Sequence, residues 1–193
     1  MLQVLCIIKD NKSSTSAISK QIFIETNDLL SLGKVADIYQ PQTIPTSALS
    51  DNNPYPVYGA NGIIGRFSKY NHETSQICIA CRGNTCGTVN YSESKSWITG
   101  NAMVINTDAY NVNKRFIYHQ LCNVNFAPLI SGSGQPQIVR TPLERMKIWC
   151  PNLEIQSKIA ETLDTLEKKR SIEISIIERL QIHKLYILSQ MFI

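Results

Sequence analysis

The sequence lacks an apolar stretch long enough to cross a bilayer. The longest charge-free apolar run near its start, residues 1–8, is far shorter than the roughly 20 residues that a membrane helix needs. Neither a basic leader nor a small-residue cleavage site accompanies this run. With 193 residues, of which 43% are apolar, the chain can bury a substantial core. We therefore expect a folded cytoplasmic protein that makes no contact with a membrane.

Groups that carry out catalysis are also scarce. His72, His119 and His183 are the three histidines, and they are scattered, without a nucleophile or carboxylate spaced to form a catalytic arrangement. The sequence has no Gly-Lys-Ser/Thr loop to hold phosphates and no glycine pattern typical of a cofactor site. These absences predict a chain without catalytic residues and without a cofactor.

The six cysteines occur in a sequence without a secretion signal, so we interpret them as reduced thiols. The spacing of Cys78, Cys81 and Cys86 suggests a zinc site. Strand alternation, however, sends Cys78 and Cys81 to opposite faces, and a fourth ligand at a useful spacing is missing. We expect buried thiols and no metal here. An enzymatic role for Cys81 or Cys86 is the alternative, and it would require loss of activity on alkylation.

Positive charge is concentrated in the middle of the chain. Residues 1–28 and residues 151–193 each carry equal numbers of basic and acidic side chains, whereas residues 29–150 carry ten basic and six acidic ones. An anionic partner should therefore bind the middle segment. A net charge of +4 is also typical of an ordinary, mildly basic surface.

The apolar pattern divides the chain into three parts. Residues 1–28 form an N-terminal extension to which the pattern assigns no role. Residues 29–150 contain short β-branched runs broken by Gly, Pro and Asn, which predicts a mainly β region. Residues 151–193 contain no Gly, and no Pro after Pro151, and are rich in Glu, Lys, Ile and Leu, which predicts one long helix. The expected fold class is α+β.

One face of the predicted helix carries an apolar stripe with an eleven-residue repeat. Such a repeat keeps a nearly straight seam along a helix of about 60 Å, which is too long for the β region to cover. Two polar residues, Arg170 and Gln181, interrupt the stripe and face each other when two copies lie antiparallel. We predict an antiparallel coiled-coil homodimer; a helix folded over its own β region is the alternative. The predicted dimer seam is Ile159, Leu163, Leu166, Arg170, Ile174, Ile177, Gln181, Leu185, Leu188 and Phe192.

Three segments of the middle region combine strand-like runs with turn residues. Residues 55–67 place Asn61-Gly62 between two such runs, where tolerance of positive φ suits a tight hairpin. Residues 76–91 predict a strand, a glycine-containing turn and a second strand, with Arg82 at the edge of the turn. Residues 130–139 predict a flexible loop, rich in donors and acceptors, that leads into a strand.

Six short motifs follow one another along residues 29–193. They are Leu32-Gly33-Lys34-Val35-Ala36-Asp37-Ile38, Tyr58-Gly59-Ala60-Asn61-Gly62-Ile63-Ile64-Gly65, Ala80-Cys81-Arg82-Gly83-Asn84-Thr85-Cys86-Gly87, Thr99-Gly100-Asn101-Ala102, Gly132-Ser133-Gly134-Gln135 and Pro151-Asn152-Leu153-Glu154-Ile155-Gln156-Ser157-Lys158-Ile159-Ala160. In this order they resemble the specificity subunit of type I restriction-modification systems. The resemblance implies a mainly β target-recognition domain at 29–150 and a spacer helix at 151–193, with the methyl donor and the DNA-cutting motor on partner subunits.

Members of this family usually carry two such domains and two helices to recognise a split DNA site, whereas this chain has one of each. We interpret it as a half-length, non-catalytic specificity subunit, in which two antiparallel copies rebuild the two-domain particle. The partners that the resemblance implies are double-stranded DNA, methyltransferase subunits and, through them, a restriction subunit. A protein-interaction adaptor that dimerises through its helix and does not bind DNA is the alternative.

DNA recognition needs two kinds of side chain. Lys and Arg neutralise phosphates and give affinity with little sequence information. Planar donors and acceptors such as Arg, Asn and Gln distinguish base edges. From the turns that we expect to be exposed, the candidate DNA-binding residues are Arg66, Lys69, Arg82, Asn84, Lys95, Lys114, Arg115, Gln135, Gln137 and Arg140.

Overall fold

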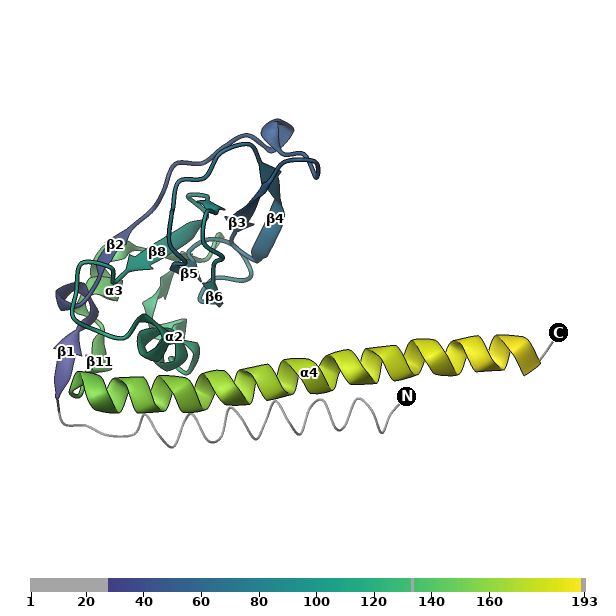
Figure 1. Cartoon of the computed structure of the whole chain (residues 1–193). Coiled ribbons are helices and arrows are strands. Elements are labelled where there is room, and N and C mark those ends of the chain that lie inside the picture. Colours follow the sequence, from purple (N-terminus) through teal and green to yellow (C-terminus); the bar gives the residue numbers. More distant parts are fainter. Residues whose placement is uncertain (1–27, 133, 192–193) are drawn as a thin grey trace.

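A sheet-rich region carries one very long helix along its side (Figure 1). The computed structural model describes residues 28–132 and 134–191, with side chains to residue 190. The predicted N-terminal extension, apart from Asp28, and the seam residue Phe192 lie outside the described residues. Within the described part, every helix is too short or too polar to span a membrane. The predicted α+β class is confirmed.

Two sheets and two short strand pairs make up the region between residues 28 and 150, here called the sheet region. Hydrogen bonding between neighbours is antiparallel except between β3 and β7, which are parallel. The four-stranded sheet has the order β2 (Asp37–Tyr39), β8 (Ala102–Asn106), β5 (Ile77–Ala80), β6 (Val89–Tyr91). The three-stranded sheet has the order β4 (Gly62–Phe67), β3 (Tyr55–Gly59), β7 (Trp97–Ile98). The pairs are β1 (Leu29–Ser31) with β11 (Lys147–Trp149), and β9 (Ile130–Ser131) with β10 (Gln137–Ile138).

The predicted strand-turn-strand segments are confirmed. β3 and β4 form a hairpin with Gly59 paired to Gly62, and the positive φ falls on Gly62, at 83°, rather than on Asn61. β5 and β6 form the second hairpin, with residues 81–88 between them. Because a residue with a Cβ rarely adopts this φ, a glycine closes the first turn.

β5 is buried on both faces and separates two apolar clusters. Ile77, Ile79 and Cys81 point into the larger cluster, which also contains buried residues of α2 and α3. Cys78 points into the smaller cluster with Val104. Because side chains alternate along a strand, a continuous apolar run fills both clusters. The prediction that Cys78 and Cys81 lie on opposite faces is therefore confirmed.

Two short helices within the sheet region were not predicted. α2 (Lys114–Cys122) begins where the Asn113 side chain accepts a hydrogen bond from the backbone N–H of Phe116, at 3.0 Å. It buries Phe116, Ile117 and Leu121 in the larger cluster. α3 (Arg140–Arg145) buries Leu143 beside Leu32 of the short 3₁₀ helix at residues 32–34. Both helices are too short for a helical period to stand out in the sequence.

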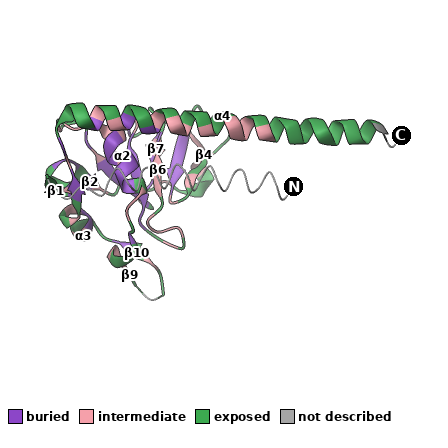
Figure 2. Cartoon of the chain, turned by 90° about the horizontal axis from the view of Figure 1, so that it is seen from below, coloured by how far each residue is buried: buried purple, intermediate pink, exposed green. Residues whose placement is uncertain are grey.

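The long helix α4 spans Leu153–Met191, 39 residues, and is therefore about 58 Å long. The Asn152 side chain accepts a hydrogen bond from the backbone N–H of Ile155 and caps its first turn. The early turns pack on α2, and Ala160 joins the larger cluster. Residues 178–190 are all exposed, and this end projects well beyond the sheet region (Figures 1 and 2).

The start of the predicted dimer seam is wrong at one position. Leu163 is 1% exposed within a single chain, so its side chain is not available to another helix. Ile159, one turn earlier, also packs partly against the larger cluster. The early turns of the helix therefore follow the alternative prediction, a helix folded over its own sheet region, whereas its later turns do not. Of the remaining seam residues, Leu166, Arg170, Ile174 and Ile177 are half-buried, and Gln181, Leu185 and Leu188 are exposed.

A charged cluster joins α2 to α4. The Arg115 guanidinium donates to Asp164 through Nε at 2.7 Å and to Glu167 at 2.8 Å, and it lies 4.6 Å from the ring centre of Tyr91. His119, which is buried, places Nε2 at 2.7 Å from Asp164 Oδ1. Burial opposes ionisation of Asp164, but the hydrogen bonds from Arg115 and His119 outweigh it and hold the pKa of the carboxyl below its ordinary value.

Replacing Asp164 with Asn should lower the free energy of unfolding at pH 7 by about 1–2 kcal/mol, because His119 loses its charged acceptor and Arg115 keeps only Glu167. The lowered pKa means that the carboxylate stabilises the fold above its unfolded pKa of about 4, and that this contribution disappears as the pH falls further. Urea denaturation at pH 7 and pH 3 should therefore show a difference between variant and wild type that shrinks at pH 3.

The matched control is Glu154→Gln, which breaks an exposed ion pair with Lys158 on the same helix and should change stability by less than about 0.5 kcal/mol. An equal loss for Asp164→Asn at both pH values would assign its effect to packing rather than charge.

Candidate nucleic-acid interface

Four loops meet at one end of the four-stranded sheet. In its antiparallel ladder, β5 ends at Ala80 opposite Ala102, where β8 begins, and β2 ends beside β8 at Tyr39. The segments that follow β2 and β5 and the segment that precedes β8 therefore reach the same edge. The β9–β10 hairpin joins them, on the side of the sheet region away from α4 (Figure 2). We call this surface, formed by residues 40–43, 81–88, 99–101 and 134–138, the amide end.

Backbone hydrogen bonds centred on Cys81 hold three of these segments together. The Cys81 N–H donates to the Asn101 carbonyl at 3.1 Å, and the Ile138 N–H donates to the Cys81 carbonyl at 3.0 Å. The Gly83 N–H donates to the Pro136 carbonyl, and Arg82 forms a β-bridge with Gln137. These bonds connect residues that are 20 and 57 positions apart in the sequence. The relative placement of the loops is therefore set by backbone rather than by mobile side chains.

The fourth segment packs on Gly100. The Gln40 amide donates to the Gly100 carbonyl at 3.1 Å, and the Gly100 N–H donates to Thr43 Oγ1 at 3.2 Å. A Cβ at position 100 would lie 2.8 Å from that oxygen and 2.9 Å from the Pro41 carbonyl. Only glycine lets the two loops approach this closely.

The amide end is polar, free of acid and mildly cationic. Its four segments contain no Asp or Glu. Among the described residues, the Arg82 side chain has no ion-pair partner. Arg140 lies just beyond the surface at the start of α3, where its Nε donates to Glu144 at 2.6 Å. The exposed planar side chains of the surface are Gln40, Gln42, Arg82, Asn84, Asn101, Gln135 and Gln137.

Four of the ten candidate DNA-binding residues share this surface: Arg82, Asn84, Gln135 and Gln137. Two others lie toward the opposite end of the sheet, near the bridge between His72 and Ser96. Of these, Lys69 is exposed, and Lys95 pairs with Glu73 at 3.7 Å.

Three further candidates use their charge inside the protein. Arg66 donates to the backbone carbonyls of Asn53 and Pro54 and so braces the turn before β3. Lys114 bonds the Ser75 carbonyl at 2.7 Å and the Asp108 carboxylate. Arg115 belongs to the cluster that joins α2 to α4. All three are half-buried, so the structure gives them a structural role, and we leave them out of the DNA surface.

Sequence reasoning missed Gln40 and Asn101. Gln40 follows an ordinary short strand, and no local pattern distinguishes it from Gln42. Asn101 lies in the Thr99–Ala102 segment that carried part of the family resemblance, which was the one available signal. Their positions at the surface depend on strand pairing between β2, β5 and β8.

One histidine, His119, meets a pair of carboxylates that the sequence did not predict. His119, Asp164 and Glu167 place one possible ligand atom each within 4.8 Å of one another. Arg115 already bonds both carboxylates, so its positive charge occupies the position that a cation would take. This group therefore fits a structural cluster and not a metal centre.

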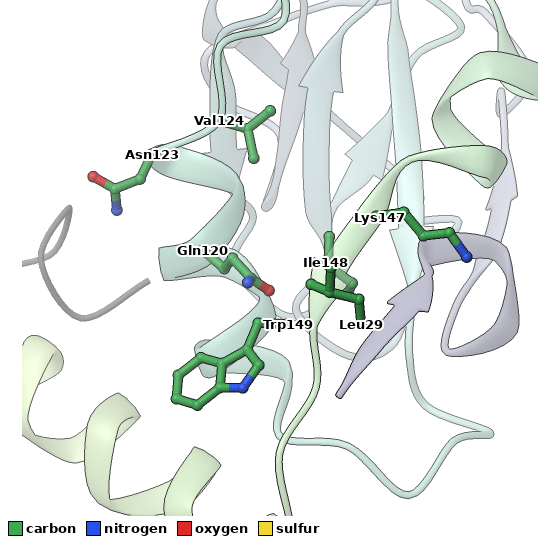
Figure 3. Close-up of a pocket in the computed structure, with 7 residues that line it drawn as sticks. All are labelled: Leu29, Gln120, Asn123, Val124, Lys147, Ile148 and Trp149. Carbon is green, nitrogen blue, oxygen red and sulfur yellow. The ribbon is translucent and has the colours of Figure 1, made fainter. Parts of the chain in front are cut away.

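A hollow between β11, β1 and α2 is also filled with engaged polar groups (Figure 3). The Gln120 amide, turned so that both ends are satisfied, pairs with the backbone of Trp149 at 3.0 and 2.9 Å. The ammonium of Lys147 bonds Ser31 Oγ at 3.1 Å. The hollow shares no residue with the amide end and serves the packing of α2 on β11.

The chain combines a sheet region, whose loops meet at an acid-free polar surface, with one long helix. Residues 25–181 match the family described as the type I restriction modification DNA specificity domain, which is most of the chain. The chain belongs to this family, and the predicted resemblance to type I specificity subunits is confirmed.

Relatives and solved structures agree with this assignment. A predicted type I restriction enzyme specificity subunit of Haemophilus influenzae is 31% identical over 70% of this chain and 36% of its own length. The EcoprrI specificity subunit of Escherichia coli is 29% identical over 58% of this chain and 28% of its own. The chain thus spans about a third of the curated relatives that it matches.

The fold recurs in specificity-subunit structures. The S subunit from M. genitalium has a TM-score of 0.68 at 19% identity, over 80% of this chain and 43% of its own. The HsdS subunit from Thermoanaerobacter tengcongensis has a TM-score of 0.61 at 19% identity, over 86% of this chain and 45% of its own.

Alkylation tests whether Cys78 and Cys81 are buried as the structure shows. Burial raises the pKa of Cys78 to about 12 and also raises the pKa of Cys81. Iodoacetamide at pH 8 should therefore leave both residues unmodified in the folded protein and alkylate both after denaturation, as measured by mass spectrometry. Rapid alkylation of native Cys81 would contradict its burial and restore the enzymatic alternative.

Proposed function

We propose that this chain is a DNA sequence-specificity component of a type I restriction-modification system and reads one half of a bipartite site through its amide end. The observation that carries the proposal is the convergence of Arg, Asn and Gln side chains on an acid-free surface built from four loops. The chain performs no catalysis in this scheme; methyl transfer and DNA cleavage belong to partner subunits.

The chemistry of the surface suits base reading more than phosphate binding. Asn and Gln present paired donors and acceptors that match base edges in the major groove, and Arg matches guanine. Backbone bonds at Cys81 hold the loops in place before DNA arrives, so little ordering free energy is needed on binding. Phosphate contacts from Arg140, which lies just beyond the surface, would add affinity that depends on salt.

The exposed half of α4 supplies a dimer interface. Leu163 is buried in its own chain and does not take part in the antiparallel seam. The seam retains the pairs Leu166 with Leu185, Arg170 with Gln181 and Ile174 with Ile177. Leu185 is 67% exposed, which leaves a large apolar side chain for a partner to cover. Glu161, Thr162, Thr165 and Leu166 form a shallow groove on α4, where the C-terminal turns of a second copy would lie.

Arg170 and Gln181 set the register of this dimer. Arg170 Nε is buried and has no hydrogen-bond partner within the described chain. That nitrogen is already covered by its own chain, whereas the guanidinium as a whole is half-buried and would donate through its Nη atoms to the carbonyl oxygen of Gln181 from the second copy. Polar pairs within an apolar seam act in this way to select one alignment.

A second apolar line on α4 stays exposed beside the seam and includes Ile172, Ile176 and Leu180. Its residues follow the four-residue spacing that lets a second helix dock along one face. We assign this line to the methyltransferase subunits, through which the restriction subunit would join. DNA, these subunits and a second copy are the proposed partners.

The DNA-binding proposal predicts that Arg82→Ala weakens binding by about 1–3 kcal/mol or lowers the salt slope by about one, because one guanine or phosphate contact is lost. Mobility shifts at two ionic strengths, with the chain alone and with its methyltransferase partner, measure both effects. Lys158→Ala, which removes a cation engaged with Glu154 on α4, is the control and should bind as wild type. Absence of salt-dependent binding in either form would favour a protein-interaction adaptor instead.

The dimer proposal predicts that Ile174→Lys combined with Ile177→Lys converts a particle of about twice 21.7 kDa into a monomer, because two charges enter the seam. Light scattering at high micromolar concentration measures the mass. Ile182→Lys, at a residue 68% exposed and outside both apolar lines, is the matched control. A monomeric wild type, or a double variant with unchanged mass, would contradict the seam.

A further inference from the structure

The side chain of Gln40 is held in a single orientation although the residue is exposed. Its Nε2 donates to the Gly100 carbonyl at 3.1 Å and to Cys81 Sγ at 3.0 Å. A side-chain amide nitrogen carries two hydrogens, so these two bonds use its full donor capacity. The Gly100 carbonyl accepts only, which places the nitrogen rather than the oxygen toward it.

Cys81 also holds the Gln40 side chain in its orientation. Its side chain is 0% exposed, and its Sγ lies 3.2 Å from the Asn101 carbonyl, to which the thiol donates. The sulfur can then accept the hydrogen bond from Gln40. Burial keeps the pKa of this thiol above its ordinary value, so it stays protonated at neutral pH and retains its donor.

The remaining polar atom of Gln40 is its carbonyl oxygen, which can only accept. Gln normally reads adenine with both ends of its amide, giving one hydrogen bond and accepting another. Here the donor end is occupied within the protein. Gln40 is therefore limited to bases that offer an amino group in the major groove, which are adenine through N6 and cytosine through N4. Guanine and thymine present only acceptors there.

We propose that Gln40 is a specificity-determining residue that selects an amino-bearing base, adenine or cytosine, at one position of each half-site, and that Cys81 is the residue that positions it. This inference rests on the proposed function of the amide end as a DNA reader. Gln40 adds an acceptor beside the donors of Arg82, whose backbone adjoins Cys81. The pair would read neighbouring bases of opposite hydrogen-bonding character.

Selection from random duplexes, using the full chain with its methyltransferase partner, tests the assignment. Gln40→Ala should relax one base position per half-site, with about a 5- to 10-fold loss of discrimination there and the other positions retained. Gln190→Ala, at an exposed glutamine near the end of α4 and outside the amide end, is the control and should keep the motif intact. Cys81→Ala should relax the same position as Gln40→Ala, and Cys81→Ser, which keeps a donor and an acceptor, should largely restore it.

Base analogues distinguish a loss of base recognition from a loss of folding, because they change the DNA and leave the protein unaltered. Replacing the selected adenine with purine, or the selected cytosine with 2-pyrimidinone, removes the amino group and should weaken wild-type binding about 5- to 10-fold. The same replacement should leave binding by Gln40→Ala unchanged. A variant motif identical to that of wild type, an even loss at every position, or a Gln40→Ala variant that is weakened by the base analogues as much as wild type would overturn the role of Gln40. A wild-type protein that selects no motif would instead overturn the proposed function itself.

Discussion

The hydrogen-bonded junction at Cys81 is the contact on which the amide end depends. Its N–H and carbonyl bond Asn101 and Ile138, and its sulfur accepts from Gln40, so one residue joins loops from four parts of the chain. Cys81 is fully buried in the larger cluster. The core therefore fixes the geometry of the surface directly, with no flexible segment between the two. Under the proposed function, this organisation would hold the loops and the Gln40 amide in the fixed geometry that discrimination between bases requires.

The charged cluster around Arg115 fixes the position of α4 on the sheet region, as Cys81 fixes the loops of the amide end. It ties α2 to the early turns of α4, so the direction in which α4 leaves the sheet region is set by charge and packing together. In the proposed dimer that direction fixes the separation of two amide ends along a duplex. The amide end and the dimer seam are far apart in sequence, yet both depend on elements packed against the same larger cluster.

Among the ten candidate DNA-binding residues, a positive charge does not by itself identify a side chain that is free to contact DNA. Arg66, Lys114 and Arg115 have the residue types expected of a DNA surface, but each satisfies carbonyls or carboxylates of its own chain. Gln40 carries no charge and belongs to no recognisable motif, yet it lies where the loops meet. Residue type alone cannot distinguish these cases, because the partner of a side chain is often contributed by a distant segment.

The sequence by itself determined the α+β class, the two hairpins, the long helix and the family, because apolar periodicity, turn residues and ordered motifs are local properties of the chain. It also placed Cys78 and Cys81 on opposite faces, since alternation along a strand is local too. Only the tertiary structure decided that Leu163 is covered, that His119 meets Asp164 and that Gln40 joins Arg82 at one surface. These outcomes depend on pairing between segments 20 to 60 residues apart, and no local pattern records which segments will pair.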